Sequence, residues 1–123
     1  MKRISLAEMN TDDLVELFAQ IVEAQDEALL GEENAKFKRL FGRMMEVSDE
    51  LKSRDGDQRR HLVQLFDSPS MQVRLQVAKL TLAVAPIEAR AQLQAIADSQ
   101  WFPQALDAGM SLWNLDRGVF KPS

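Results

Sequence analysis

The chain contains no cysteine and no tyrosine, a single histidine, four prolines and five glycines. Without cysteine, neither a disulfide nor a thiolate-bound metal can form, so the composition favours a reducing, cytoplasmic compartment. No apolar run approaches the roughly 20 residues that a membrane-spanning helix needs. Lys2 and Arg3 are followed by acidic residues and not by an apolar segment. We therefore expect no signal peptide and no membrane partner.

Positive charge is also scarce, and it is unevenly distributed. The net charge is −4; residues 1–57 carry 14 acidic and 8 basic groups, whereas residues 58–123 carry 5 and 7. Nucleic-acid binding needs a dense basic stripe, so we expect no nucleic-acid partner and disfavour a repeat-built nucleic-acid enzyme. The acidic half would attract a basic partner, although a solvated acidic face is the simpler interpretation.

The residues that are abundant, Ala, Leu, Gln, Glu and Arg, favour helix. Apolar positions three or four apart predict helices at residues 11–30, 34–53, 58–66, 71–85, 86–99 and 103–117. The expected end residues are Thr11, Asp57 and Ser70 as N-caps, Pro86 and Pro103 as first residues, and Gly31 and Gly118 just past a helix.

Six helices with short loops predict an all-α fold in one domain, residues 1–123. The architecture that we expect is a right-handed stack of about three antiparallel helical hairpins. The helix at 71–85 is apolar on nearly every side and should be buried at the centre. In the helix at 103–117, Leu106, Met110 and Trp113 are expected to face the core, together with the flanking Ala105, Leu112 and Leu115.

Residues 62–97 contain a spaced set of apolar positions with one Asp and one Arg: Leu62, Leu65, Phe66, Asp67, Val73, Arg74, Ala78 and Leu82. In this pattern the segment resembles a HEAT repeat, which implies a HEAT-like α–α superhelix. One departure is Met71, which stands where the repeat usually has proline. Asp67 ends one expected helix and Arg74 opens the next, so we interpret them as a structural pair that fixes the hairpin angle, by pairing or by bonding free backbone groups.

Nearly the whole chain resembles a bacterial family described as a domain of unknown function. Three segments carry the resemblance: residues 24–29 (AQDEAL), 105–113 (ALDAGMSLW) and 118–122 (GVFKP). The resemblance implies a small all-α fold and no activity.

We find no constellation that predicts a catalytic site, a metal site or a cofactor. Glu23, Asp26 and Glu27 share one helix face, but the Glu-x-x-His pairs of di-metal bundles are missing. His61 has no second metal-ligand type beside it and is expected at the surface. Two adjacent arginines, Arg59 and Arg60, are interpreted as solvated.

The candidate partner-binding residues are Gln25, Arg39, Arg43, Trp101, Phe102 and Phe120. Gln25 interrupts an apolar stripe, so its amide either bonds a neighbouring helix or lines a groove. The three aromatic residues fit no helical stripe, and they serve either as hot spots at a rim or as caps of the core.

A helical scaffold without a chemical centre predicts a non-enzymatic protein-binding or adaptor module, monomeric or weakly dimeric. Its partner, another protein, would lie along the helices at 34–53, 71–85 and 103–117, or on the acidic first hairpin. The alternative is a small immunity or antitoxin-like protein that blocks one enzyme by covering a basic active site.

Overall fold

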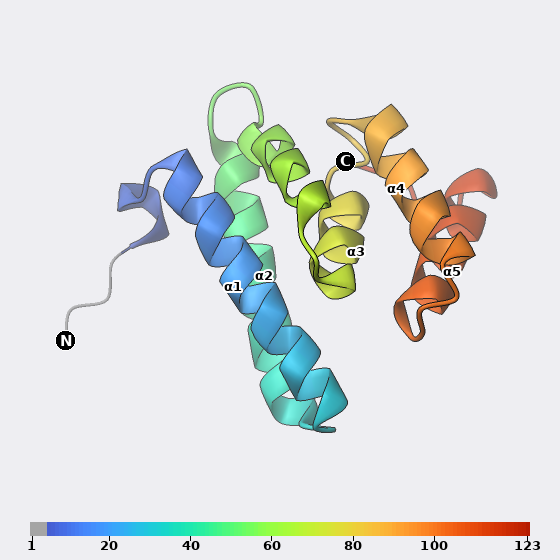
Figure 1. Cartoon of the computed structure of the whole chain (residues 1–123). Coiled ribbons are helices and arrows are strands. Elements are labelled where there is room, and N and C mark those ends of the chain that lie inside the picture. The colour runs from blue at the N-terminus through green and yellow to red at the C-terminus, as the bar shows by residue number, and fades with distance from the viewer. Residues whose placement is uncertain (1–4) are drawn as a thin grey trace. The chain divides into compact units, whose positions relative to one another are not determined.

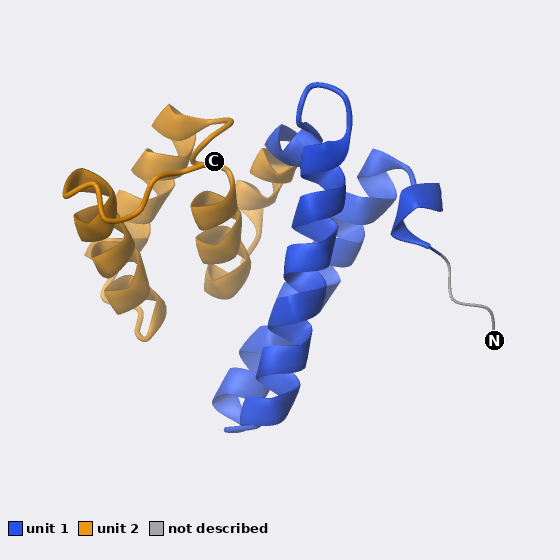
Figure 2. Ribbon diagram, turned by 180° about the vertical axis from the view of Figure 1, so that it is seen from behind, with its two compact units in different colours: residues 1–61 blue, residues 62–123 orange. Residues whose placement is uncertain are grey.

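The computed structural model describes residues 5–123, and every regular element in that range is a helix (Figure 1). The chain divides into two compact units, residues 1–61 and residues 62–123 (Figure 2). The predicted all-α fold is confirmed. The single domain stays a prediction, because each unit is compact by itself.

The first unit is built on a hairpin of two long helices. A short 3-10 helix η1 (Leu6–Glu8) precedes α1 (Thr11–Leu30) and α2 (Asn34–Ser53), which pack against each other along their length. Both long helices have the predicted bounds. Their facing apolar stripes make the core, whose fully buried apolar side chains include Leu14, Phe18, Val22, Met44 and Leu51.

The capping residues of α1 differ from the sequence prediction by one position, although its bounds do not. Asn10, not Thr11, is the N-cap: its side-chain oxygen accepts the backbone N–H of Asp13 at 2.8 Å. At the other end, Gly31 has φ −86°, and Glu32 adopts the left-handed conformation with φ 57°. The cap moves because the Thr11 hydroxyl is engaged elsewhere, with Gln58 and Arg54.

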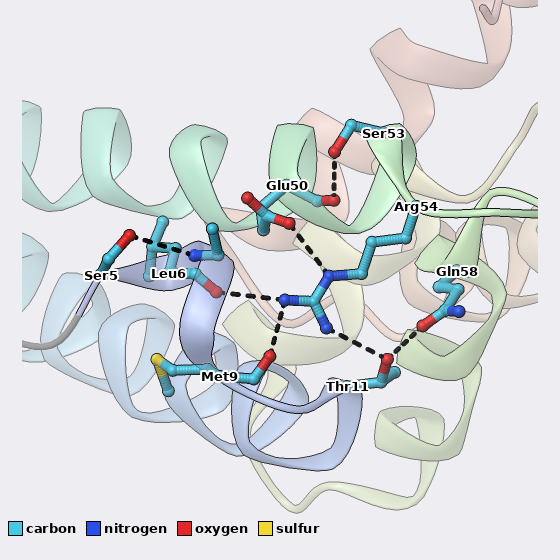
Figure 3. A network of polar contacts seen from close by, with 9 residues as sticks. Ser5, Leu6, Met9, Thr11, Glu50, Ser53, Arg54 and Gln58 are labelled. Atoms are coloured by element: carbon cyan, nitrogen blue, oxygen red, sulfur yellow. Dashed lines mark hydrogen bonds and ion pairs between the residues drawn. The ribbon is translucent and has the colours of Figure 1, made fainter.

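Arg54, at the end of α2, ties η1 to the hairpin (Figure 3). Its Nε donates to Glu50 at 3.0 Å, and a terminal nitrogen donates to the carbonyl oxygens of Leu6 at 3.1 Å and Met9 at 2.6 Å. The other terminal nitrogen donates to the Thr11 hydroxyl at 3.5 Å. The fixed fork of the guanidinium therefore gives the Met9 carbonyl a donor and adds a second donor to the Leu6 carbonyl, which already accepts the N–H of Met9.

Lysine at position 54 would keep the charge but lose the fork. We expect Arg54→Lys to lower the free energy of unfolding by about 1–2 kcal/mol and to speed amide exchange at Glu8 and Met9. Urea denaturation and hydrogen exchange measure both effects. Arg60→Lys is the matched control at an exposed position, and equal losses in the two variants would contradict the role given to Arg54.

A 3-10 helix η2 (Gln58–Asp67) crosses from the first unit into the second, where α3 (Met71–Leu80), α4 (Pro86–Asp98) and α5 (Gln104–Asp116) follow. In the second unit α3 packs on α4 and α5, and α4 packs on α5. The core of this unit includes Leu75, Ala78, Ala89, Leu93, Ile96 and Ala108. Burial of α3 is as predicted, because six of its residues are buried.

The predicted helix over 71–85 is too long, since α3 ends at Leu80. Thr81 is buried there, and its hydroxyl donates back to the carbonyl oxygen of Val77 at 2.7 Å. The carbonyl of Thr81 in turn accepts the N–H groups of Val84 and Ala85, closing a turn. Threonine bonds its own backbone in this way at the expense of helix continuation.

Candidate functional site

A groove with a volume of about 580 Å³ runs along α5 in the second unit. Five of the residues that line it are apolar: Leu82, Pro103, Leu106, Met110 and Phe120. The remaining lining is polar and comes mostly from α5. Since no other element of this unit covers α5 on this side, the groove opens to solvent.

The groove exists because α5 carries apolar residues on two faces. Ala105 and Ala108 are buried against the other helices of the unit, whereas Leu106, Met110 and Trp113 are 60%, 54% and 60% exposed. The prediction that these three face the core is therefore wrong. Two small alanines let α5 approach its neighbours closely, and the large side chains are left on the open side.

One carboxylate organises the polar side of the groove. Lys79 on α3 donates to the two oxygens of Asp107 at 3.1 and 3.3 Å, and the Ser111 hydroxyl donates to Oδ1 at 3.2 Å. The Lys79 ammonium and the Ser111 hydroxyl thus both donate to the Asp107 carboxylate. This arrangement braces α3 against α5.

The C-terminal tail contributes Phe120 to the lining of the groove. Gly118 has φ 72°, and its N–H donates to the carbonyl of Leu115, while the N–H groups of Val119 and Phe120 both donate to the carbonyl of Asn114. These are the bonds of a Schellman motif, and the glycine after the helix is as predicted. The motif reverses the chain and returns Phe120 to the groove.

The model of the family described as "Domain of unknown function (DUF2019)" matches residues 12–116. The chain belongs to the DUF2019 family. It is similar to the protein RPA1889 from Rhodopseudomonas palustris CGA009, known from its crystal structure: the two are 61% identical, the match covers 98% of this chain and 100% of that chain, and the TM-score is 0.95. No curated protein matches the chain.

The match to the DUF2019 model includes α2 to α5 and all of α1 except Thr11, and hence every helical residue that lines the groove. It ends at Asp116, before the tail that carries Phe120. The resemblance of residues 24–29 and 105–113 to a domain-of-unknown-function family is thus confirmed.

Of the aromatic residues singled out in this DUF2019 sequence, Phe120 lines the groove and is 42% exposed. Trp101 and Phe102 lie in the loop between α4 and α5 and are 63% and 67% exposed. Such exposure rules out the interpretation that the two loop aromatics cap the core. They precede Pro103, where the groove begins.

The remaining partner-binding candidates lie in the first unit. Gln25 is fully buried, and its amide nitrogen contacts Met44 Sδ at 3.4 Å on α2. It therefore bonds a neighbouring helix, the first of its two alternatives, and it is not available to a partner. Arg39 is exposed, and Arg43 is half-buried.

Asp67 and Arg74 do not form the predicted pair. Among the hydrogen bonds and ion pairs of the described residues none joins them, Asp67 is exposed, and Arg74 Nε is buried without an acceptor. One reason lies in η2, because a 3-10 helix has 3.0 residues per turn against 3.6 in an α-helix. Over ten residues the direction of the last side chain changes by about half a turn.

Arg59 also differs from its prediction, because it is buried and not solvated. Its Nε and a terminal nitrogen donate to the Asp57 carboxylate at 2.9 and 2.6 Å. That hydrogen bonding holds the pKa of Asp57 below its ordinary value of 3.8. His61 is exposed, as predicted.

Within residues 5–123, no three His, Cys, Asp or Glu side chains come together where they could hold a metal ion. None of the helices there combines the length and the apolar character that crossing a bilayer demands.

Sequence reasoning missed most residues of the groove. Leu82, Lys79 and Asp107 come from segments that the chain separates, and Lys79 and Asp107 are 28 positions apart. One local pattern could have indicated part of the groove: Asp107 and Ser111 are four residues apart, which places them on the same side of α5.

Proposed function

We propose that this protein is a non-enzymatic helical-repeat module, HEAT-like in its hairpins, that binds another protein in the cytoplasm through the α5 groove. The observation that supports this proposal is the exposure of Leu106, Met110 and Trp113 along one side of α5. Monomeric proteins rarely leave large apolar side chains together on the surface unless the patch serves an interaction.

The charges near the groove indicate the character of the partner. The two charged side chains that line the groove, Lys79 and Asp107, are paired with each other. With these charges neutralised inside the chain, apolar contact dominates recognition. An amphipathic helix with apolar residues at i, i+3 or i+4 and i+7 fits an elongated apolar groove of this kind.

The test compares two variants that each add one negative charge at an exposed apolar residue. Met110→Glu places the charge in the groove, whereas Ile87→Glu places it on α4, at a residue that is 79% exposed and does not line the groove. We expect the wild type and Ile87→Glu to capture one and the same protein from a lysate of the source organism. The Kd of that protein for Met110→Glu should be at least tenfold higher than its Kd for the wild type.

Circular dichroism and thermal unfolding establish that both variants are folded. Capture of the same partner by Met110→Glu with unchanged Kd, or loss of capture in both variants, would show that the groove is not the binding site.

A second candidate function rests on the acidic side of α1. Asp12, Glu16 and Glu23 are exposed and lie at i, i+4 and i+11, on one face of that helix. A face of this kind suits an immunity or antitoxin-like protein that covers a basic active site. Rescue of cells by coexpression with a toxic neighbouring gene product, and loss of rescue in Glu16→Lys with Glu23→Lys, would favour it.

A further inference from the structure

An exposed arginine without an acidic partner lies at the C-terminal end of α5. Arg117 immediately follows the helix, and its Cζ lies 4.8 Å from the centroid of the Trp113 ring. Within residues 5–123 no ion pair includes Arg117. Because the ring covers a face of the planar guanidinium, the N–H donors in its plane stay accessible. We call Trp113 and Arg117 the cationic stack.

Positive charge is in excess around the cationic stack. Asp116 is the acidic residue nearest to it along the chain, and Asp116 is paired with Arg90 on α4 at 2.8 Å. Glu88, in the first turn of α4, lies about 160° around that helix from Arg90 and so on the side away from Asp116. Residues 117–123 contribute Lys121 as a second cation and contain no acidic residue.

The cationic stack continues the exposed side of α5 that forms the groove. Met110 lines the groove, and it precedes Trp113 by three residues and Arg117 by seven. At this spacing the three side chains follow one another along one face of the helix. Arg117 lies about 6 Å beyond Trp113 along the helix axis. A partner that lies along the groove therefore reaches the guanidinium.

On the basis of the function proposed for the groove, we infer that the cationic stack binds a carboxylate of the partner helix. Apolar side chains of that helix at i, i+3 or i+4 and i+7 face the groove, and an Asp or Glu one turn before the first of them meets Arg117. The guanidinium donates two parallel hydrogen bonds to the carboxylate. Stacking on Trp113 orients the guanidinium before the partner arrives, so less conformational freedom is lost on binding.

The helix dipole sets the direction of the bound helix. Asp and Glu stabilise a helix in its first turn and destabilise it in its last turn. The acidic end of the partner helix is therefore its N-terminus. Since Arg117 is at the C-terminus of α5, the partner helix runs antiparallel to α5, and the two dipoles oppose each other.

The concave, mostly apolar groove beside the cationic stack favours a helix over other anionic surfaces. A bilayer is flat on this scale and would leave the groove between Leu82 and Met110 uncovered. Nucleic acid requires a longer series of cations, because its affinity rises with the number of phosphates neutralised. A single exposed fork beside an apolar groove matches one carboxylate on an amphipathic helix.

A displayed library of random peptides of about 18 residues, the length of five helical turns, is selected on the purified full chain. We expect the selected peptides to share the apolar spacing given above and an Asp or Glu one turn before it. A labelled peptide with the selected sequence is titrated by fluorescence anisotropy, and its circular dichroism should show helix formation on binding. Its affinity should fall as salt is added.

A double-mutant cycle places the carboxylate. Arg117→Gln, and the amide in place of the acidic residue of the peptide, should each weaken binding about threefold to tenfold. Both changes together should weaken it no more than either alone, because they remove the same contact. Arg60→Gln removes one exposed charge from a residue that does not line the groove, and as the matched control it should weaken binding less than about twofold.

Met110→Glu, titrated with the same peptide, reports on the groove itself. Loss of binding in Met110→Glu with equal small effects of Arg117→Gln and Arg60→Gln would leave the groove as the binding site and overturn the role of the cationic stack. Unchanged binding in Met110→Glu would overturn the groove and the stack together.

Three other results would also contradict a carboxylate at the cationic stack. They are selected peptides without an acidic residue at that position, additive losses in the cycle, and tighter binding to phosphatidylserine vesicles than to the peptide. Self-association in light scattering that disappears in Met110→Glu would make a second copy of the chain the occupant and would overturn the inference as well.

Discussion

Phe18→Ala is expected to lower the free energy of unfolding by about 3–5 kcal/mol, the largest loss among the changes considered. Phe18 is 0% exposed and lies in the middle of α1, where its ring fills the contact with α2. Removing the ring takes away its transfer free energy and leaves a cavity that two long helices cannot close. The free energy of unfolding of a native protein is about 5–15 kcal/mol, so such a loss is a large fraction of the stability.

Urea denaturation followed by circular dichroism measures this loss, and Leu30→Ala is its control, at a residue that is 78% exposed. The control should change stability by less than about 0.5 kcal/mol. Both tryptophans, Trp101 and Trp113, belong to the second unit, so their fluorescence reports on that unit. A loss below about 1 kcal/mol would show that Phe18 is not a principal contact of the hairpin.

The second large effect concerns Asp57 and depends on pH. Asp57→Asn should cost about 1.5–3 kcal/mol near pH 7, because hydrogen bonds to a charged carboxylate are replaced by weaker ones. Arg59, which donates these hydrogen bonds, is only 6% exposed, so water cannot readily replace the bonds that the variant loses. Asparagine is the suitable replacement because residue 57 has φ 52° and asparagine tolerates the left-handed region.

The direction of the pH dependence follows from the pKa. The hydrogen bonds from Arg59 hold the folded-state pKa of Asp57 below 3.8. Its contribution is therefore fully present above the unfolded-state pKa and is lost as the pH falls through the folded-state pKa. The stability difference between wild type and Asp57→Asn should be largest near neutral pH and shrink below about pH 4.

Urea titrations at neutral and acid pH measure that difference, with the exposed Asp55→Asn as control. A constant difference between wild type and Asp57→Asn across the range would contradict the ion pair as its source.

The features that the sequence predicted correctly depend on local patterns. The bounds of α1 and α2 follow from two clear apolar stripes and from polar residues at their ends, so Thr11–Leu30 and Asn34–Ser53 were predictable. The glycine at 118 was predictable for a similar reason, because it immediately follows a helical pattern. In each case the interactions that decide the structure lie within a few residues.

The features that were missed depend on which of two competing contacts forms. On α5, Leu106 and Ala105 are both apolar, and periodicity alone does not say which face the neighbouring helices cover. The burial of Arg59 depends on a left-handed Asp57 that folds a carboxylate back onto it. The groove joins Lys79, Asp107 and a returning tail, and no short window of sequence contains all three.

The turn at Gly118 gives the groove two kinds of wall. On one side Leu106 and Met110 are fixed by the packing of α5, whereas on the other Phe120 is held by a chain reversal built on two backbone hydrogen bonds to Asn114. Phe120, the tail residue that lines the groove, is therefore placed by the chain reversal and not by the packing of the helix core. If the groove binds a partner as proposed, relatives with the same helices and a different residue at this position would differ in partner selectivity.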